Sequence, residues 1–385
     1  MKKKVVSFTS LLLSGLMCFG AVGCGASKDK EGDVTDSTCS ENLPEEEQAS
    51  FKAIFPENGK EISVVNEGME NFLEQEELVG VLVDAYVTNT DNFAPKLISL
   101  SWECEKTLTD CVVTVATDRE FTKNVAVYHN AHESVPVIEN SYVNCEYFWE
   151  ISATTEDGER LESNVFSFKV KATPRTVNIP GVSNTRDIGG YNVADGKVKQ
   201  GMIYRTAKFD DITEDGLFVA NERLKVKTDL DLRNVGEGSA GGTSPLGCEK
   251  YLRLTSPYYS IFSTEQKAQV REIMKVFADE TNYPIAMHCS LGRDRTGTIA
   301  FLLNAFLGVA REDLRTDYFL SCFSKAGTVL DGASYVVLEK NFNGMYDQID
   351  ASYQGENYAK KVEAYLLSAD VTLEELNEIK RIMLE

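Results

Sequence analysis

The stretch that decides the fold runs from residue 285 to residue 308 and reads IAMHCSLGRDRTGTIAFLLNAFLG. It begins with a short apolar segment, Ile285 to Met287, which is typical of a buried strand. It continues through a loop into an almost wholly apolar run that predicts a buried helix ending near Gly308. A strand, a loop and a buried helix in this order predict an α/β domain with the loop at the carboxyl edge of its sheet.

A second helix is predicted before this strand, in the sequence STEQKAQVREIMKVFADE that begins at Ser263. Ser263 and Gln266 have the spacing of a capping box, which satisfies backbone N–H groups at the start of a helix. Residues that recur at helical spacing form one apolar face, and they are Val270, Ile273, Met274 and Phe277. The helix is therefore expected to cover one side of the sheet.

The loop itself reads CSLGRDRTG from Cys289 to Gly297 and has the composition of a phosphate site. Backbone N–H groups at the start of a helix converge on one point, and the helix dipole favours an anion there. The same groups stabilise a thiolate at Cys289, which makes this residue a nucleophile near neutral pH. Arg295 can hold two phosphate oxygens in a bidentate fork, and Gly292 relieves the tight turn.

The composition of the 385-residue chain excludes two classes of protein. Its hydrophobic content of 43% is too high for a disordered chain, and its formal net charge of −21 is far too acidic for a nucleic-acid binder. At about 100–200 residues per domain, the length predicts two or three domains. The acidic excess is concentrated in the N-terminal half, so an anionic ligand is expected in the C-terminal half.

The cysteines and histidines argue against metal chemistry. The chain has nine Cys, an odd number without a CxxC pair, and only three His. These features exclude a zinc site of the usual spacing and a fully paired disulfide framework. We therefore expect no metal and no cofactor.

The N-terminus has the layout of an export signal. Three lysines, from Lys2 to Lys4, precede an apolar run from Val5 to Val22. The following sequence, with Gly23 and Cys24, resembles the bacterial lipobox, which implies a signal peptide over residues 1–23, lipidation of Cys24 and an extracytoplasmic protein anchored to the cell membrane. A signal peptide cleaved elsewhere and a single membrane-spanning anchor are the alternatives. The acidic residues 24–50, almost without large apolar side chains, predict a disordered tether.

Short alternating runs separated by polar turns predict a β-sandwich over residues 51–172. This stretch resembles a fibronectin-type-III-like module, in which Trp102 and Trp149 would lie in an early and a late strand. Cys104, Cys111 and Cys145 allow either one disulfide or free thiols. The predicted strands are residues 97–102, 111–116, 124–128, 147–153 and 165–170.

Residues 177–385 resemble the protein tyrosine phosphatase superfamily, whose signature is Cys, five residues, Arg and then Ser or Thr. A narrower resemblance, to a bacterial subgroup whose members are often secreted, rests on ordered motifs at residues 184–191 (NTRDIGGY), 201–213 (GMIYRTAKFDDIT), 231–233 (DLR) and 317–321 (DYFLS). It implies an α/β cysteine-phosphatase domain, a protein tyrosine phosphatase or a dual-specificity phosphatase, that acts on a phosphorylated protein or a small phosphomonoester. The implied substrate-binding residues are Ser290, Leu291, Gly292, Arg293, Thr296, Arg186 and Asp187.

The resemblance also implies a two-step mechanism. Cys289 attacks phosphorus and forms a phosphocysteine, which water then hydrolyses, while Arg295 and the loop amides hold the charge. Thr296 donates a hydrogen bond to the sulfur, and His288 supports the loop. A general acid must protonate the leaving oxygen, and Asp231 and Asp294 are both candidates.

Several further expectations follow from the same residues. Arg186 and Asp187 would form an ion pair beside the loop, and Arg205 and Arg233 would pair with carboxylates. Residues 325–365 would form a helical lid. Two other functions compete with a protein phosphatase: an inositol-phosphate or phosphoinositide phosphatase, and a phosphoprotein-binding or adhesion lipoprotein without activity.

Overall fold

The computed structural model describes residues 51–76, 83–87, 93–237, 242–324 and 334–385, and these belong to one compact unit, Ala49–Glu385. The predicted signal peptide, Cys24 and the tether lie outside the described residues. The expected α/β phosphatase-like domain is confirmed, and the region before it consists mostly of strands in several small sheets.

The C-terminal part is built on a five-stranded sheet in the order β11-β14-β17-β15-β16. Strands β14, β17, β15 and β16 are parallel, and β11 pairs with β14 in the antiparallel sense. The central strand is β17, so its carboxyl end lies between two parallel neighbours. The strands are β11 (Arg186–Asp187), β14 (Ile203–Thr206), β15 (Thr228–Asp231), β16 (Lys250–Arg253) and β17 (Ile285–His288), and β12 (Asn192–Val193) and β13 (Gly196–Lys197) form a separate pair.

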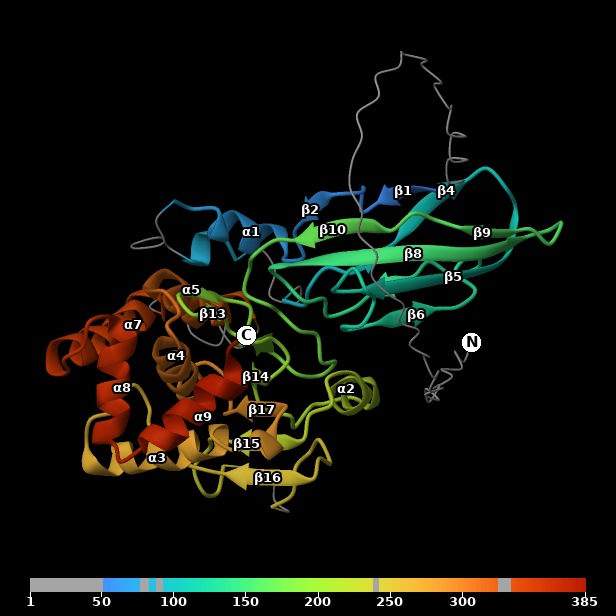
Figure 1. Ribbon diagram of the computed structural model, residues 1–385. Helices are drawn as coiled ribbons and strands as arrows, with labels where there is room; N and C mark the ends of the chain where they lie inside the picture. Colours follow the sequence, from blue (N-terminus) through green and yellow to red (C-terminus); the bar gives the residue numbers. More distant parts are fainter. Residues whose placement is uncertain (1–50, 77–82, 88–92, 238–241, 325–333) are drawn as a thin grey trace, which may run out of the picture. The chain divides into compact units, whose positions relative to one another are not determined.

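Both faces of this sheet are buried, because alternate residues of its strands enter different clusters. Ile285 and Met287 of β17 pack in the largest cluster, and Ala286 packs in another on the opposite face. Figure 1 shows α3, α4, α8 and α9 on one side of the sheet and α2 on the other. The helices are α2 (Glu214–Phe218), the π-helical turn η3 (Val219–Arg223), α3 (Thr264–Phe277), η4 (Glu280–Asn282), α4 (Arg295–Leu307), α5 (Arg311–Phe319), η5 (Leu320–Phe323), α7 (Ser334–Ser352), α8 (Tyr358–Ser368) and α9 (Leu373–Met383).

The two helices predicted from sequence are confirmed. Helix α3 begins after Ser263, which forms the capping box with Gln266, and its four predicted apolar residues are buried. Helix α4 is buried along almost its whole length. It ends at Gly308, whose φ of 97° places it in the left-handed region that favours glycine.

The N-terminal part contains the predicted strands with somewhat different ends. Its largest sheet has the order β2-β10-β8-β5-β6, and β9 pairs with β8. Trp149 of β8 is fully buried, and its ring centroid lies 6.3 Å from that of Trp102. The elements are β1 (Phe51–Phe55), β2 (Lys60–Ile62), α1 (Glu67–Leu73), η1 (Val83–Ala85), β3 (Ile98–Ser99), β4 (Ser101–Cys104), β5 (Leu108–Ala116), β6 (Ala126–Tyr128), β7 (Val137–Ile138), β8 (Cys145–Thr155), β9 (Arg160–Glu162) and β10 (Phe166–Val170).

Helix α1 was not predicted from the sequence, and its buried apolar side chains belong to the core of the C-terminal part. Its residues Met69 and Phe72 are buried in the same cluster as α4 and α5, and the ring of Phe72 lies 5.6 Å from that of Phe323. The seven-residue helix is too short to give a clear periodic pattern. Because these side chains complete the core of the C-terminal part, experiments on function require the full chain.

The cysteines of the N-terminal region are free thiols rather than a disulfide. All the cysteines that the structure describes are free, including Cys104, Cys111 and Cys145. Burial raises the pKa of the Cys111 and Cys145 thiols to about 11 in each case, so both stay protonated at neutral pH.

The expected helical lid is only partly described, because residues 325–333 lie outside the described residues. The remainder forms α7 and α8, and Phe342, Met345 and Ile349 of α7 are buried in the main core. This burial makes α7 part of the fold rather than a cover that opens.

Two features are absent from the described residues. None of the helices in this part of the chain is long and apolar enough to cross a membrane. Within the same residues, no three His, Cys, Asp or Glu side chains lie together where they could hold a metal ion.

Candidate active site

The loop from Cys289 to Asp294 connects the end of the central strand to the first turn of α4. Strand β17 ends at His288, and α4 begins at Arg295. The N-cap residue of α4 is Asp294, whose side chain caps no helix N–H group. Backbone N–H groups at this end of a helix lack intrahelical partners, and the helix dipole favours negative charge beside them. The loop therefore lies where an anion is favoured.

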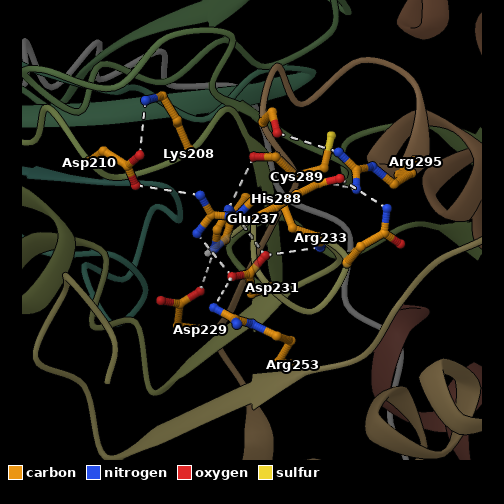
Figure 2. A network of polar contacts seen from close by, with 12 residues as sticks. Lys208, Asp210, Asp229, Asp231, Arg233, Glu237, Arg253, His288, Cys289 and Arg295 are labelled. Carbon is orange, nitrogen blue, oxygen red and sulfur yellow. Dashed lines mark hydrogen bonds and ion pairs between the residues drawn. The ribbon is translucent and has the colours of Figure 1, made fainter. Parts of the chain in front are cut away.

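Cys289 and Arg295 lie at the two ends of this loop. Cys289 is 2% exposed. The Arg295 guanidinium donates from Nη2 to Ser290 Oγ at 3.3 Å and from Nη1 to Glu237 Oε2 at 2.7 Å (Figure 2). Its Nε is buried and has no hydrogen-bond partner among the described residues. The arginine thus has a donor that an oxygen of a bound anion could satisfy.

Three donors from other elements hold the loop by its carbonyl oxygens. Asn184 Nδ2 donates to Leu291 O at 2.9 Å, and Arg205 Nη2 donates to Gly292 O at 2.8 Å. The backbone N–H of Lys208 donates to Ser290 O at 3.3 Å. These three hydrogen bonds tie the backbone of the loop to the elements around it.

Gly292 is required by the close approach of the loop to β14. Its φ is 68°, and a Cβ built on it would lie 2.2 Å from the backbone oxygen of Thr206. A side chain would both strain this backbone conformation and push the loop away from the strand.

The ion pairs behind the loop differ from the pair predicted between Arg186 and Asp187, and that expectation was wrong. Arg186 donates from Nε to Asp317 Oδ1 at 3.0 Å, and Arg205 pairs with the other oxygen of Asp317. Asp187 instead accepts from Arg175 Nη1 at 2.7 Å. Adjacent residues on β11 point to opposite faces of the strand, so Arg186 and Asp187 cannot face one another. Both are fully buried behind the loop, in supporting positions.

Asp231 lies at the end of β15 and is held as a carboxylate. Arg233 donates from Nε and Nη2 to its two oxygens, each at 2.9 Å, and Tyr251 OH donates at 2.8 Å. Arg253 adds a contact at 3.4 Å. Burial acts to raise the pKa of Asp231, but the hydrogen bonds from Arg233 and the charge of His288 hold that pKa well below its usual range. A general acid must carry a proton before the reaction, and this carboxyl group does not at neutral pH.

Asp294 is also held by an arginine, the Arg293 beside it. Arg293 donates from Nε at 2.7 Å and from Nη2 at 2.9 Å to the two oxygens of Asp294. Tyr259 OH donates to one of the same oxygens. Burial would lower the pKa of Arg293, but its bonds with Asp294 raise it instead. Both side chains are almost fully buried, so the charge of Arg293 is already neutralised within the loop.

His288 and Thr296 flank the loop without reaching its open side. His288 Nδ1 lies 3.2 Å from the carbonyl oxygen of Cys289. Its Nε2 lies 2.9 Å from Asp229 Oδ1, although the two groups are not aligned for a hydrogen bond. The predicted hydrogen bond from Thr296 to the Cys289 sulfur is not formed, and the buried Thr296 hydroxyl has no partner among the described residues.

The structure adds two carboxylates that the sequence did not single out. Asp317 belongs to the DYFLS motif, so the sequence indicated that this segment matters. It did not indicate that Asp317 pairs with Arg186 and Arg205. Nothing in the sequence marked Glu237 as a site residue, because its partner Arg295 lies 58 positions away.

Comparison with known proteins identifies a family and several similar solved structures. Residues 177–385 match the family described as the tyrosine phosphatase family. No curated protein matches the chain. The core catalytic domain of the PP-IP phosphatase SIW14 from S. cerevisiae, solved with citrate, is 17% identical over 43% of this chain and 91% of that chain, with a TM-score of 0.27. A second structure, of the Siw14 catalytic core, is 15% identical over 48% of this chain and 94% of that chain, with a TM-score of 0.30.

Proposed function

The chain belongs to the tyrosine phosphatase family, and we propose that it is a protein tyrosine phosphatase that works through a phosphocysteine intermediate. The observation that carries the proposal is the loop of Cys289 to Arg295 between β17 and α4. It combines a nucleophile, an anion-binding helix terminus and an arginine with an unsatisfied donor.

The reaction has two steps on this loop. The Cys289 thiolate attacks phosphorus, the S–P bond forms, and the bond from phosphorus to the leaving oxygen breaks. Water then attacks phosphorus, and the S–P bond breaks to restore the thiolate. In both steps Arg295 and the N–H groups of α4 stabilise the charge on the equatorial oxygens, which is the largest expected contribution to the rate.

The charges around the loop favour a substrate with a single phosphate group. A phosphate-rich inositol ring needs several cations that are free to meet it. Around this loop, each described cation is already matched by a carboxylate: Lys208 by Asp210, Arg233 by Asp231, Arg253 by Asp231, Arg293 by Asp294, and Arg186 and Arg205 by Asp317. Two cations have exposed partners, Arg295 with Glu237 and Lys208 with Asp210, so these two can be freed for a phosphate group, which is fewer than a phosphate-rich ring needs.

Exposed apolar surface beside the loop favours an aromatic leaving group. Tyr258 is 55% exposed, and its ring centroid lies 4.6 Å from that of Tyr259, which bonds to Asp294. Val235, near Glu237, is 87% exposed. Exposed side chains of this kind beside a phosphate site contribute contacts to a phosphotyrosine ring and far less to a phosphoserine side chain.

The test measures phosphate release by the purified full chain. We expect hydrolysis of p-nitrophenyl phosphate in EDTA, its loss in Cys289→Ser, and a higher kcat/KM for a phosphotyrosine peptide than for the matched phosphoserine peptide. Faster release from inositol hexakisphosphate or from a phosphoinositide would favour the inositol function instead. A chain that binds phosphopeptides with no turnover at any pH from 5 to 8 would be a binding protein, which contradicts the proposal.

We propose the same location that the N-terminal sequence predicts, outside the cytoplasmic membrane and anchored through a lipid on Cys24. The support is the Ala21-Val22-Gly23-Cys24 sequence after an apolar run. Labelling with a palmitate analogue should mark the wild-type chain and not Cys24→Ala, and equal labelling of both would contradict the lipid anchor.

We also propose that the strand-rich region is a fibronectin-type-III-like module. The packed pair Trp102 and Trp149 supports this assignment.

A further inference from the structure

A third carboxylate, Glu237, meets the catalytic loop from the connection between β15 and β16. Its Oε2 accepts from Arg295 Nη1 at 2.7 Å, and its Oε1 accepts from Asn234 Nδ2 at 2.9 Å. Figure 2 shows this carboxylate against the Arg295 guanidinium, next to the loop that carries Cys289. Glu237 therefore contacts the arginine that a phosphate group must bind.

Glu237 is held much less firmly than the other two carboxylates. Asp231 is fully buried and Asp294 is 6% exposed, and each is fixed by both arms of an arginine and by a tyrosine hydroxyl. The Glu237 side chain is 40% exposed and receives one hydrogen bond from a single cation. The arginines of Asp231 and Asp294 are each engaged by two hydrogen bonds to their carboxylates, whereas a phosphate group in the loop would compete directly with Glu237 for Arg295.

We propose that Glu237 is the acid–base residue of the phosphatase reaction, a proposal that rests on the function proposed above. In the first step its carboxylic acid gives a proton to the leaving oxygen as the bond between that oxygen and phosphorus breaks and the S–P bond forms. In the second step its carboxylate takes a proton from the water whose oxygen attacks phosphorus, and the thiolate leaves.

Substrate binding raises the pKa of Glu237, and the carboxylate then takes from solvent the proton that this role requires. In the free protein the hydrogen bond from Arg295 holds the pKa of Glu237 below its usual range, so the group is a carboxylate. A phosphate dianion that takes the Arg295 fork removes this favourable charge and places a like charge beside the carboxylate. Both changes raise the pKa of Glu237. Arg295 on α4 is the charged side chain that contacts it among the described residues, Asn234 on its own segment is neutral, and Cys289 lies on the neighbouring loop.

The first experiment compares leaving groups in the full chain. In Glu237→Gln the amide oxygen can still accept a hydrogen bond from Arg295, but the side chain cannot give a proton to the leaving oxygen. We expect kcat/KM for phenyl phosphate, whose leaving group is poor, to fall by about 10² to 10³-fold, and that for p-nitrophenyl phosphate by less than about tenfold. The matched control is Glu249→Gln, an exposed carboxylate on the same connection, which should leave both values unchanged.

The second experiment measures proton uptake on anion binding, which a merely structural role would not produce. Calorimetry with sulfate, an anion that does not titrate near neutral pH, is done on Cys289→Ser in two buffers of different ionisation enthalpy. We expect proton uptake near pH 6 in Cys289→Ser and none in the double variant with Glu237→Gln. Equal uptake in both would overturn the proposal.

Other outcomes separate this proposal from the one on which it rests. If wild type hydrolyses neither substrate, or Cys289→Ser retains activity, the phosphatase function fails. If the activity depends on Cys289 but Glu237→Gln loses the same factor on both substrates, Glu237 only orients Arg295 and the acid proposal fails. A selective loss on phenyl phosphate in Asp294→Asn or Asp231→Asn, absent from Glu237→Gln, would assign the acid to one of those residues instead.

Discussion

Replacing Asp317 with Asn should destabilise the protein by removing the charge between two buried arginines. Asp317 accepts from Arg186 Nε at 3.0 Å and pairs through its other oxygen with Arg205, and both arginine side chains are fully buried. Removing one partner of a buried ion pair leaves an uncompensated charge and costs about 3–5 kcal/mol. Asn has nearly the same volume as Asp, so no cavity adds to this loss. We expect the free energy of unfolding to fall by about this amount.

The free energy of unfolding that Asp317→Asn loses should be largest at neutral pH and smaller in acid. Burial acts to raise the pKa of Asp317, but Arg205 and Arg186 hold it below its usual range. A carboxyl group whose pKa is lower in the folded than in the unfolded protein stabilises the fold. This stabilisation is complete above the pKa of the unfolded chain, about 3.9 for Asp, and it is lost as the pH falls through the pKa of the folded protein. The difference between wild type and Asp317→Asn should therefore be full at pH 7 and shrink below about pH 4.

Urea denaturation of the full chain at several pH values measures this difference. The control is Asp313→Asn on the same helix, since burial and then the charge of Glu312 raise the pKa of Asp313 and its charge is not stabilising. Activity should fall as well, by up to about 10²-fold in kcat/KM, because Arg205 also holds Gly292 O. A variant that unfolds within about 0.5 kcal/mol of wild type, or no more easily than the control, would refute the reasoning.

Three further substitutions test the loop. Arg295→Lys should lower kcat/KM for p-nitrophenyl phosphate by about 10² to 10³-fold, because a lysine cannot present the planar fork, and a loss under tenfold would contradict that role. Gly292→Ala should lower the Tm and the rate together, since its Cβ would lie 2.2 Å from Thr206 O, and wild-type values of both would be inconsistent with this contact. Thr296→Val should retain both the Tm and the steady-state turnover of p-nitrophenyl phosphate, because the Thr296 hydroxyl is buried without a described partner and makes no hydrogen bond to the Cys289 sulfur. A burst of p-nitrophenol in this variant, which would show slower hydrolysis of the phosphocysteine, would contradict this expectation.

The elements predicted correctly from the sequence are those set by residues close together in the chain. Ser263 and Gln266 form the start of α3, and Gly308 ends α4 in a left-handed conformation. The apolar run between Thr296 and Leu307 is buried, as its composition predicts. Capping, periodicity and glycine conformation act over one or two helical turns, so the local sequence is sufficient for them.

Helix α1 and the partners of the charged residues could not be predicted in this way. Met69 and Phe72 are buried in one cluster with α4 and α5, which lie more than 200 residues later in the chain. Nothing in the sequence of α1 indicates these partners. Arg186 lies beside Asp187 in the sequence but pairs with Asp317, 131 positions away. Ion-pair partners are chosen by which elements meet in space, and adjacent residues of a strand face apart.

The sequence alone determined the chemistry that this loop can perform. The residue types and spacing of Cys289, Gly292 and Arg295 between an apolar strand and an apolar helix predict an anion site with a nucleophile, because the helix terminus supplies the N–H groups locally. Only the tertiary structure decided how firmly each acidic group is held. Asp231 and Asp294 each bond to an arginine within two residues and to a tyrosine hydroxyl that another segment brings to them, whereas Glu237 meets an arginine 58 positions away and its side chain is 40% exposed.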